Sequence, residues 1–555
     1  MNTKHLGLKL LLIGLVCFAA LFNLETSPFR YLVPAAPFTD SPGGQLAGDT
    51  YVYLYTGGLI PKGLMPYRDF FDHKGPLLYL IMALGITIGR EAGVWLIQSV
   101  FLFAAAFFAY KTARLLTGRR AAAAAAALAV TWYSLGETGP DTFAVPFLLA
   151  GLYSLVRFVL SGWTIRRAEA FGVGVSFAAV LLMKMNLVSL WIVFTGTVIV
   201  SSVIGRRFRF LLERTAFFLA GAALVILPVL AWLWLKGSFD DFVRVYLKFN
   251  LTDYGDPPPF GNGLLYFIPM IFRRTLQAAV HWSLYFCYNL PAFLTYFFLF
   301  LYEKNRPRKI LFGLLAAMVL LSVHLIGAKG WHFVYYCYPM TADYLIFFAL
   351  AFEFIFRIAA RRRIPAAVLF LLLTAPALRA LAIPPVTDWV KRQWILHADP
   401  AADLAVYGRP IRTDRGALDL ARYLRENTPP DARINGVGCS VYWYADRICA
   451  CPFLFEPEAK LPQRGQLPLS RFRPLSFLPA QRSSRLTFYE DGNGNPPEYI
   501  FEQRRRNPRI GRIAAGGKGS SDELETSPEI EARLNSGYEL VYQNGQYDLY
   551  RLKPR

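Results

Sequence analysis

The sequence predicts a polytopic α-helical membrane protein with about 11 transmembrane helices and a C-terminal soluble α/β domain. Of the 555 residues, 55% are hydrophobic and 17% are charged, which is less charge than a soluble protein of this size carries. Many apolar runs approach or exceed the roughly 20 residues that an α-helix needs to cross a bilayer. These runs stop after Ile383. We therefore expect a membrane domain over residues 1–383 and a soluble domain over residues 384–555.

The expected spans follow from the apolar runs. The first is interpreted as an uncleaved span, because no convincing small-residue cleavage site follows it. Gly75–Gly89 is apolar too, but its 15 residues rise only about 22 Å as a helix, short of a hydrocarbon core of roughly 30 Å. We expect it to be a juxtamembrane or half-inserted helix. The eleven predicted spans are Leu8–Phe22, Gly93–Leu116, Ala121–Leu135, Thr142–Leu160, Ala170–Met183, Leu187–Ile204, Thr215–Leu235, Trp282–Tyr302, Ile310–Gly327, Phe333–Phe356 and Pro365–Ile383.

Many of the Arg and Lys residues behind the net charge of +21 lie in short clusters between the spans. Clusters of this kind anchor cytoplasmic loops, so the charge does not indicate a nucleic-acid partner. With the N-terminus inside, eleven spans place every cluster on the cytoplasmic side. The same topology places the isolated charges that are candidates for function, and the C-terminal domain, on the outer side. The clusters are Gly118-Arg119-Arg120, Arg166-Arg167, Arg206 to Arg209, Lys304 to Lys309 and Arg361 to Arg363.

The C-terminal region has its own periodicity. Asp414 to Arg425 is typical of an amphipathic helix, with Leu418, Ala421 and Leu424 on one face. Further elements predicted there are a strand over Ala432–Val437, a terminal β-hairpin over Tyr538–Tyr542 and Tyr547–Leu552, and a loop or disordered segment over Arg504–Ser527.

Six cysteines offer no metal-type C-x-x-C pair. In an oxidising compartment, Cys439 would be able to pair with either Cys449 or Cys451. The sequence leaves that pairing open.

The first outer loop, within residues 24–92, carries the most informative charges. Asp49 is a candidate general base that takes a proton from an acceptor hydroxyl. An Asp at a loop end is equally suited to cap a helix. Lys74 precedes Gly75-Pro76, which opens a helix, and helix N-termini favour anions. Lys74 is thus a candidate phosphate ligand, with a snorkelling interfacial lysine as the alternative.

Other charges on the predicted outer side are weaker candidates. Asp72 and His73 adjoin Lys74 and make the cluster denser than membrane anchoring alone requires. Glu137 and Asp141 precede the fourth span and suit orientation of an acceptor or sugar, or helix capping. The remaining candidates for phosphate contact are Lys184, Lys329 and His332.

The sequence lacks the short motifs that mark several common classes of enzyme and transporter. The sequence has no P-loop, no G-x-G-x-x-G, no H-E-x-x-H and no G-x-S-x-G. The patterns therefore do not favour ATP-driven transport, nicotinamide chemistry, a metalloprotease or a serine hydrolase. We expect no required cofactor, with a divalent metal as an open alternative.

At these residues the chain resembles the multi-spanning type C glycosyltransferases. It is most similar to bacterial relatives of the protein O-mannosyltransferases and of the lipid A aminoarabinose transferase. The resemblance covers most of the chain in layout, but its specific part is His73-Lys74-Gly75-Pro76. The family usually has Pro where this chain has Gly75, and often an acidic residue where it has Thr50. The other segments that carry the resemblance are Asp49 with Tyr53, Pro66 to Leu77, Glu137 with Asp141, Leu182 to Lys184, His332 to Pro339 and, more weakly, Arg433 to Arg447.

The resemblance implies an inverting transfer from a polyprenyl-phosphate-linked sugar donor, with Asp49 as the base and Lys74 as a phosphate ligand. The implied acceptor is an extracytoplasmic lipid, polysaccharide or protein. The implied location is the bacterial cytoplasmic (inner) membrane, with the active site and C-terminal domain facing the periplasm or exterior.

Two other functions fit parts of the sequence. A lipid-linked-sugar flippase would also need many spans, but transporters place charges near mid-membrane and often have internal repeats. A receptor or scaffold with a multi-span anchor would leave the cluster from Asp49 to Lys74 unexplained.

Overall fold

The chain folds into two compact units. The helical unit comprises Met1–Arg30, Lys74–Gly237 and Tyr254–Ala380, and the mixed unit comprises Tyr31–His73, Ser238–Asp253 and Leu381–Arg555. One of the boundaries between the units falls between His73 and Lys74, inside the segment that the sequence singled out. The computed structural model describes residues 3–29, 48–134, 136–253, 288–327, 338–362, 415–436, 439–449, 473–474, 489–490, 496–503, 534–544 and 547–554.

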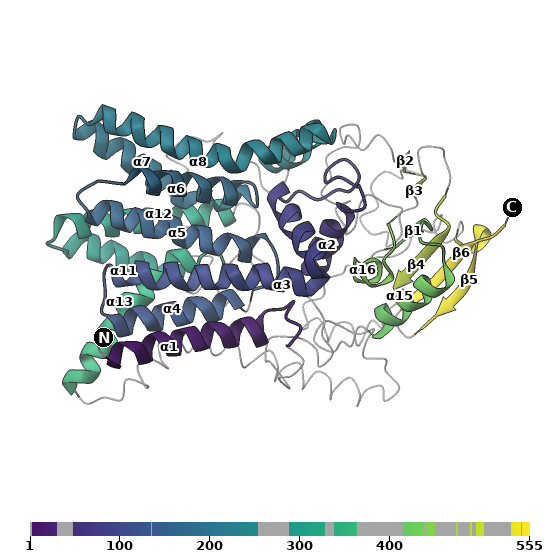
Figure 1. The fold of residues 1–555 in the computed structure, drawn as a ribbon, viewed down its shortest axis with the longest axis horizontal. Helices are drawn as coiled ribbons and strands as arrows, with labels where there is room; N and C mark the ends of the chain where they lie inside the picture. Colours follow the sequence, from purple (N-terminus) through teal and green to yellow (C-terminus); the bar gives the residue numbers. More distant parts are fainter. Residues whose placement is uncertain are drawn as a thin grey trace. The chain divides into compact units, whose positions relative to one another are not determined.

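The described part of the helical unit consists of helices packed side by side. In Figure 1, α3, α4, α5 and α6 run alongside one another, and α8 packs along α6. The elements are α1 (Thr3–Phe18), η1 (Ala19–Asn23), α3 (Pro76–Arg114), α4 (Arg119–Ser134), α5 (Pro140–Leu160), α6 (Arg167–Leu181), η3 (Met185–Leu187), α7 (Ser189–Ile204), α8 (Phe208–Leu235), α11 (Asn289–Tyr302), α12 (Arg306–Gly327) and α13 (Thr341–Arg362).

Four helices in the described residues are long and apolar enough to cross a membrane: Pro76–Arg114, Pro140–Leu160, Phe208–Leu235 and Arg306–Ile326. Shorter apolar helices lie at Gly7–Asn23, Ser189–Ile204 and Asn289–Tyr302. The chain is therefore a helical protein of multi-pass membrane type. A helix lies at each predicted span except Pro365–Ile383, which falls outside the described residues. The total of eleven spans stays a prediction.

Helix α3 is sharply bent where the sequence predicts the end of a short helix. Gly89 and Arg90 have non-helical backbone angles, and Arg90 has a φ of 53°. After this bend the two halves touch, because a Cβ on Gly93 would lie 1.9 Å from the carbonyl oxygen of Gly85. Two glycines at this contact allow the close backbone approach. The segment that begins at Pro76 is thus a separate short helix ahead of the longer one.

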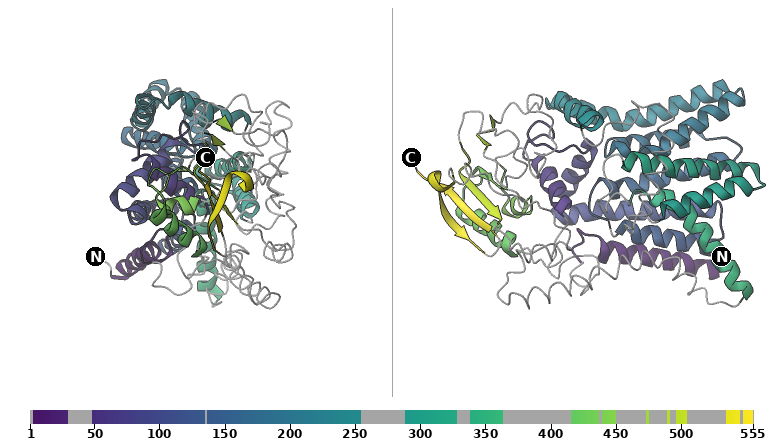
Figure 2. Two further views of the ribbon diagram at one scale, coloured as in Figure 1. Left: turned by 90° about the vertical axis from the view of Figure 1, so that its right-hand side faces the viewer. Right: turned by 180° about the vertical axis from the view of Figure 1, so that it is seen from behind.

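The mixed unit combines short helices with small sheets (Figure 2). The strand order of the larger sheet is β1-β4-β6-β5, in which β1 pairs parallel with β4 and the other pairs are antiparallel. The elements are α2 (Gly48–Leu59), α9 (Phe239–Phe242), η4 (Val243–Asp253), α15 (Arg415–Asn427), β1 (Ile434–Asn435), α16 (Cys439–Ala445), β2 (Arg473–Pro474), β3 (Tyr489–Glu490), β4 (Tyr499–Gln503), β5 (Tyr538–Gln543) and β6 (Tyr547–Leu552).

The C-terminal predictions are partly confirmed. The hairpin is present as β5 and β6, with a register shift between Leu540 and Tyr542. The predicted helix is α15, but its predicted apolar face is wrong at Leu418, which is 37% exposed. The buried face is formed by Ala417, Leu420, Ala421 and Leu424, at the i, i+3, i+4, i+7 spacing of a helix face. The segment Arg504–Ser527 and Cys451 lie outside the described residues.

Candidate active site

Asp49 lies in the first turn of α2 and is half-buried. An acidic side chain at this position stabilises a helix, so the capping alternative and the base hypothesis are both compatible with its place. The next residue, Thr50, is fully buried, as are most of the residues that follow it in the helix. Asp49 is therefore carried by a helix that is packed on several sides and is not part of a solvated loop.

The chain after α2 forms a fixed turn. Tyr67 has a φ of 70°, an uncommon conformation for a side chain of this size, and is fully buried. The amide of Tyr67 donates to the carbonyl oxygen of Phe70 at 3.0 Å. The carboxylate of Asp69 accepts the Met65 amide at 2.7 Å and pairs with the Arg68 guanidinium at 2.7 Å. Strained backbone of this kind persists only where its surroundings hold it.

Helices α9 and η4 supply those surroundings. Ser238 donates its hydroxyl to the carbonyl oxygen of Pro66, and Asn250 donates its side-chain amide to the carbonyl oxygen of His73 at 2.7 Å. The ring of Phe249 packs against Phe71 and His73. The segment from Ser238 to Asn250 thus holds the segment from Pro66 to His73.

The two carboxylates Asp49 and Asp72 are in the same neighbourhood within the mixed unit. Asp72 is 1% exposed, and the Nδ1 atom of His73 lies 3.8 Å from its carboxylate. Burial raises the pKa of the Cys439 thiol well above its usual range, and the charges of Cys449, Asp72 and Asp49 add to that effect. Both carboxylates therefore act on one thiol at the start of α16.

Lys74 and Gly75 belong to the helical unit, where a backbone contact fixes their position. Gly75 donates its amide to the carbonyl oxygen of Met183 at 2.9 Å, and Leu77 donates to that of Leu182 at 3.0 Å. A Cβ on Gly75 would lie 2.0 Å from the Leu182 oxygen, so only glycine fits there. The predicted short helix begins at Pro76, directly after this contact.

Asp141 and Lys184, which the sequence predicts in separate roles, form a buried ion pair. The Nζ atom of Lys184 lies 2.8 and 2.6 Å from the two carboxylate oxygens of Asp141. Lys184 is 8% exposed and Asp141 is 4% exposed. Lys184 directly follows Met183, which accepts the Gly75 amide, so the pair and the Lys74 turn share one region. Buried pairs of this kind need both partners, because one alone would leave an uncompensated charge.

Glu137 is half-buried and lies next to Thr138, which forms hydrogen bonds with two polar side chains. Its carbonyl oxygen accepts the Thr142 hydroxyl at 2.6 Å. Next to it, the Thr138 amide donates to the carboxylate of Glu25 at 2.9 Å, and the Thr138 hydroxyl donates to Gln98 at 3.2 Å. Glu137 therefore lies at the helix entry that the sequence predicted, among groups that fix the backbone.

The structure thus groups the predicted residues into two sets. Asp49, Asp72 and His73 form the set of the mixed unit, and Lys74, Glu137, Asp141 and Lys184 belong to the helical unit. Lys329 and His332 lie outside the described residues. In the part of the chain that is described, no group of three or more His, Cys, Asp or Glu side chains is arranged to hold a metal ion.

The sequence analysis did not identify the residues whose side chains bind the backbone from Pro66 to His73. Asn250 and Ser238 lie after the seventh predicted span, in a segment to which the sequence analysis assigned no role. Tyr51 and Tyr55 have the i, i+4 spacing of one helix face. That spacing is a signal for packing, but it does not name the partner.

Known proteins are similar to this chain in part of its sequence and in its fold. The family model of the competence-induced protein Ccs4 N-terminal domain matches residues 45–256. That range contains both sets of candidate residues but neither Lys329 nor His332. No curated protein matches the chain.

Two solved structures share the fold over almost the whole chain. The structure of ArnT from Cupriavidus metallidurans bound to undecaprenyl phosphate has a TM-score of 0.52 at 11% identity, covering 99% of both chains. The apo state of the same protein has a TM-score of 0.51 at 12% identity, covering 100% of both chains. The predicted resemblance to a type C glycosyltransferase is therefore confirmed at the level of the fold.

Proposed function

We propose that the chain is a membrane glycosyltransferase that transfers a sugar from a polyprenyl-phosphate-linked donor to an extracytoplasmic lipid, polysaccharide or protein. The observation that carries this proposal is the full-length likeness of its fold to ArnT, a protein whose structure holds undecaprenyl phosphate. The charged residues supply what the reaction needs, namely a carboxylate for the acceptor and cations for the donor phosphate.

In the proposed reaction, Asp49 takes the proton of the acceptor hydroxyl as the acceptor oxygen attacks the anomeric carbon of the sugar. The bond between that carbon and the phosphate oxygen breaks, and its electron pair leaves with the polyprenyl phosphate. Attack from the opposite face inverts the anomeric configuration. Lys74 neutralises the charge that develops on the leaving phosphate, so a second carboxyl acting as general acid is not needed.

The other candidates have supporting roles in this proposal. Lys184 supplies hydrogen-bond donors for the donor phosphate, with Asp141 holding its ammonium in place. Asp72 and Glu137 orient the acceptor or the sugar. His73, Lys329 and His332 complete the contacts to the donor. Because lysines neutralise the phosphate, the reaction requires no cofactor, and EDTA should leave turnover unchanged.

The proposed location is the cytoplasmic (inner) membrane of a bacterium, with the reacting groups and the C-terminal residues outside the cytoplasm. The support is the distribution of basic clusters between the predicted spans. The partners are then the membrane-bound donor, the acceptor and the surrounding lipids, with no nucleic acid.

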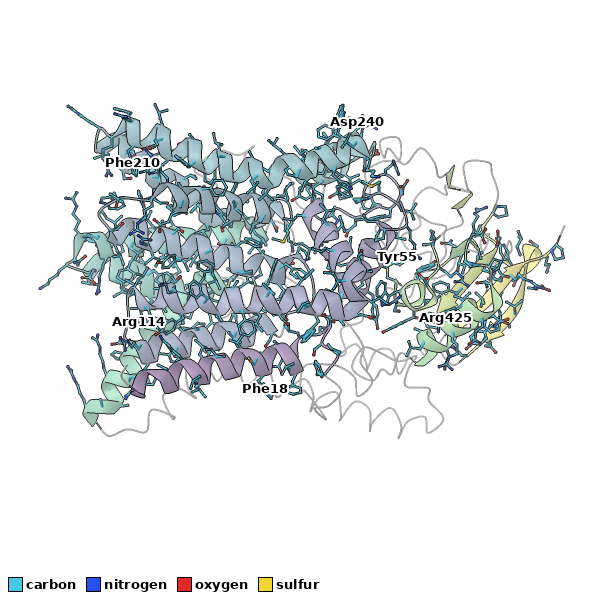
Figure 3. The ribbon with its side chains drawn as sticks, in the orientation of Figure 1. Phe18, Tyr55, Arg114, Phe210, Asp240 and Arg425 are labelled. Atoms are coloured by element: carbon cyan, nitrogen blue, oxygen red, sulfur yellow. The ribbon has the colours of Figure 1, made fainter. Side chains whose placement is uncertain are left out.

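The test is an Asp49→Asn variant of the full chain, purified and reconstituted in lipid vesicles. Loss of a general base should lower turnover by about 10²–10⁴-fold, with little change in protein level. Asp240→Asn is the matched control, since Asp240 is an exposed acid of the mixed unit with no assigned role (Figure 3). Transfer is followed with a labelled polyprenyl-phosphate sugar and an acceptor fraction from the cell envelope.

Near-normal turnover of Asp49→Asn would falsify the assignment of the base. The rival function, a lipid-linked-sugar flippase, needs donor binding but no base. If the wild type and Asp49→Asn move the donor across the vesicle membrane at equal rates and neither transfers the sugar, the flippase is favoured. Mass spectrometry of envelope glycans from a deletion strain shows which glycan loses a sugar.

A further inference from the structure

Helix α2, which carries Asp49, is held along one side by α16 and the residues that follow it, which lie 384 to 394 residues further along the chain. Tyr51 and Tyr55 lie four residues apart on α2 and so occupy one face. This face packs against α16, and Figure 3 marks Tyr55 on it. All of these residues belong to the mixed unit.

Four contacts join α2 and the turn after it to α16 and the residues that follow α16. The hydroxyl oxygens of Tyr51 and Tyr444 are 2.8 Å apart, and their rings meet edge to face with centroids 5.6 Å apart. The ring of Tyr55 packs against that of Tyr442 at 5.5 Å. The remaining two contacts are made by residues that follow α16 in the chain. The Tyr55 hydroxyl accepts the Cys449 amide at 2.7 Å, and Lys62 pairs with Asp446 at 2.6 Å.

The Tyr55 contacts are buried and the Tyr51 contact is part-buried, whereas the lysine contact is exposed. Tyr51 and Tyr55 are each 4% exposed, and Tyr442 is fully buried. Burial raises the pKa of the Tyr55 hydroxyl well above its usual range, so the group stays neutral while its oxygen accepts the Cys449 amide. Side chains of Lys62 and Asp446 are 37% and 61% exposed, and exposed pairs contribute little. The two tyrosines therefore carry the contact.

We propose that α16 positions the proposed base, and that Tyr55, together with Tyr51, is the positioning residue through which it acts on Asp49. The inference rests on the proposed function. A helix of 12 residues moves as one body, so fixing two of its side chains fixes the rotation and the height of its first turn. The C-terminal residues then contribute to transfer without touching the reacting atoms.

Removal of the Tyr55 hydroxyl is the sharpest change. Tyr55→Phe keeps the ring against Tyr442 but leaves the buried Cys449 amide without this acceptor. A displacement of about 1 Å at a reacting group is able to cost about 10²-fold in rate, so a smaller shift should lower kcat roughly tenfold. The KM for the donor should stay unchanged, because the donor contacts are assigned to other residues. Tyr55→Ala should be slower than Tyr55→Phe.

The experiment compares kcat and KM of the purified full-length variants, with a polyprenyl-phosphate sugar as donor, in lipid vesicles. Lys62→Ala is the matched control, because it removes the exposed contact of the same interface, and it should keep the wild-type kcat. Tyr55→Phe is also placed in the Asp49→Asn background. A residue that acts through Asp49 should not slow the residual reaction further, whereas general destabilisation should slow it in both backgrounds.

Amide hydrogen exchange supplies a readout that does not need activity. Exchange in α2 should quicken in Tyr55→Phe, with α5 of the helical unit unchanged. If the wild type is active, Asp49→Asn is inactive and Tyr55→Phe has the kcat of the wild type, this inference alone is overturned. Unchanged exchange in α2 of Tyr55→Phe would also overturn it. An inactive wild type with quickened exchange would instead overturn the proposed function and retain the hold of α16 on α2.

Discussion

At the scale of single residues, Lys74 is fixed by its neighbours in the chain. The carbonyl group before it, on His73, accepts Asn250, and the amide group after it, on Gly75, donates to Met183. These contacts fix the backbone at Lys74, and both the phosphate-binding hypothesis and the snorkelling alternative are compatible with them.

Lys74→Ala should weaken donor binding and slow transfer by about 10–100-fold, since a hydrogen bond to a charged group contributes about 1.5–3 kcal/mol. Lys74→Arg should restore only part of this, because a guanidinium differs in shape and reach. Donor affinity and turnover are measured on folded protein. Full rescue by Arg, with Ala lowering only stability, would identify a snorkelling lysine. Unchanged affinity in Lys74→Ala would assign the phosphate to Lys184 or Lys329.

Gly75 should tolerate no side chain. In Gly75→Ala the new methyl group would meet the backbone oxygen of Leu182 at 2.0 Å, so the turn has to move and Lys74 moves with it. We expect at least a tenfold loss of turnover, by the sensitivity of reaction rates to misplacement of about 1 Å. The control is Gly172→Ala in α6, where nothing lies within 4 Å of the added atom. Equal turnover in the two variants would show that the turn adapts.

At the scale of elements, short helices of the mixed unit depend on side-chain caps. Arg447 is 5% exposed and closes the C-terminal end of α15. Its guanidinium donates to the carbonyl oxygens of Thr428 at 2.7 Å, Arg425 at 3.1 Å and Leu424 at 3.4 Å. These are the carbonyl groups that a helix end leaves without partners inside the helix.

Arg447→Ala should lower the stability of the mixed unit by about 2–4 kcal/mol, because several buried carbonyl groups lose their donor together. Arg447→Lys should recover little, since an ammonium lacks the planar fork. Thermal unfolding and hydrogen exchange of α15 report the loss. Arg422→Ala removes an arginine from the same helix whose side chain is 64% exposed, and it should leave both unchanged. A similar loss in both variants would contradict the capping role.

At the scale of the whole molecule, the chain shares its fold with ArnT over its full length at 11–12% identity. At so low an identity, the likeness shows a shared fold and gives no residue-by-residue correspondence. A shared fold does not fix the sugar or the acceptor, which depend on side chains at the site.

The proposed orientation is tested with single cysteines in a background without native cysteines. Pro61 and Asn535 are exposed, so Pro61→Cys and Asn535→Cys should react with a membrane-impermeant maleimide in intact cells. Arg120→Cys, at an exposed end of α4 in a predicted inner cluster, should react only after permeabilisation. Labelling of the first two only after permeabilisation would reverse the topology. Thr50 is unsuitable for labelling because it is fully buried.

Sequence alone determined the features that depend on local composition and period. Long apolar runs predicted the helices, because the length of a hydrophobic helix is set by the bilayer it crosses. Alternating residues predicted the terminal hairpin of β5 and β6, and Gly75-Pro76 predicted the start of a helix. The predicted buried face of α15 was wrong at Leu418. Periodicity shows that a helix has an apolar face, but it does not show which residues lie at the middle of that face, where the helix packs on its partner.

Tertiary structure decided which distant residues meet. The pairing of Asp141 with Lys184, the contact of Gly75 with Leu182 and Met183, and the hold of Asn250 on His73 join positions 43 to 177 residues apart. Nothing local encodes such contacts, since they form only when separate helices pack and buried polar groups have to find partners. For the same reason, the sequence showed only that Tyr55 and Tyr51 share a helix face. The partners of Tyr55, on α16 and directly after it, were identified only from the structure.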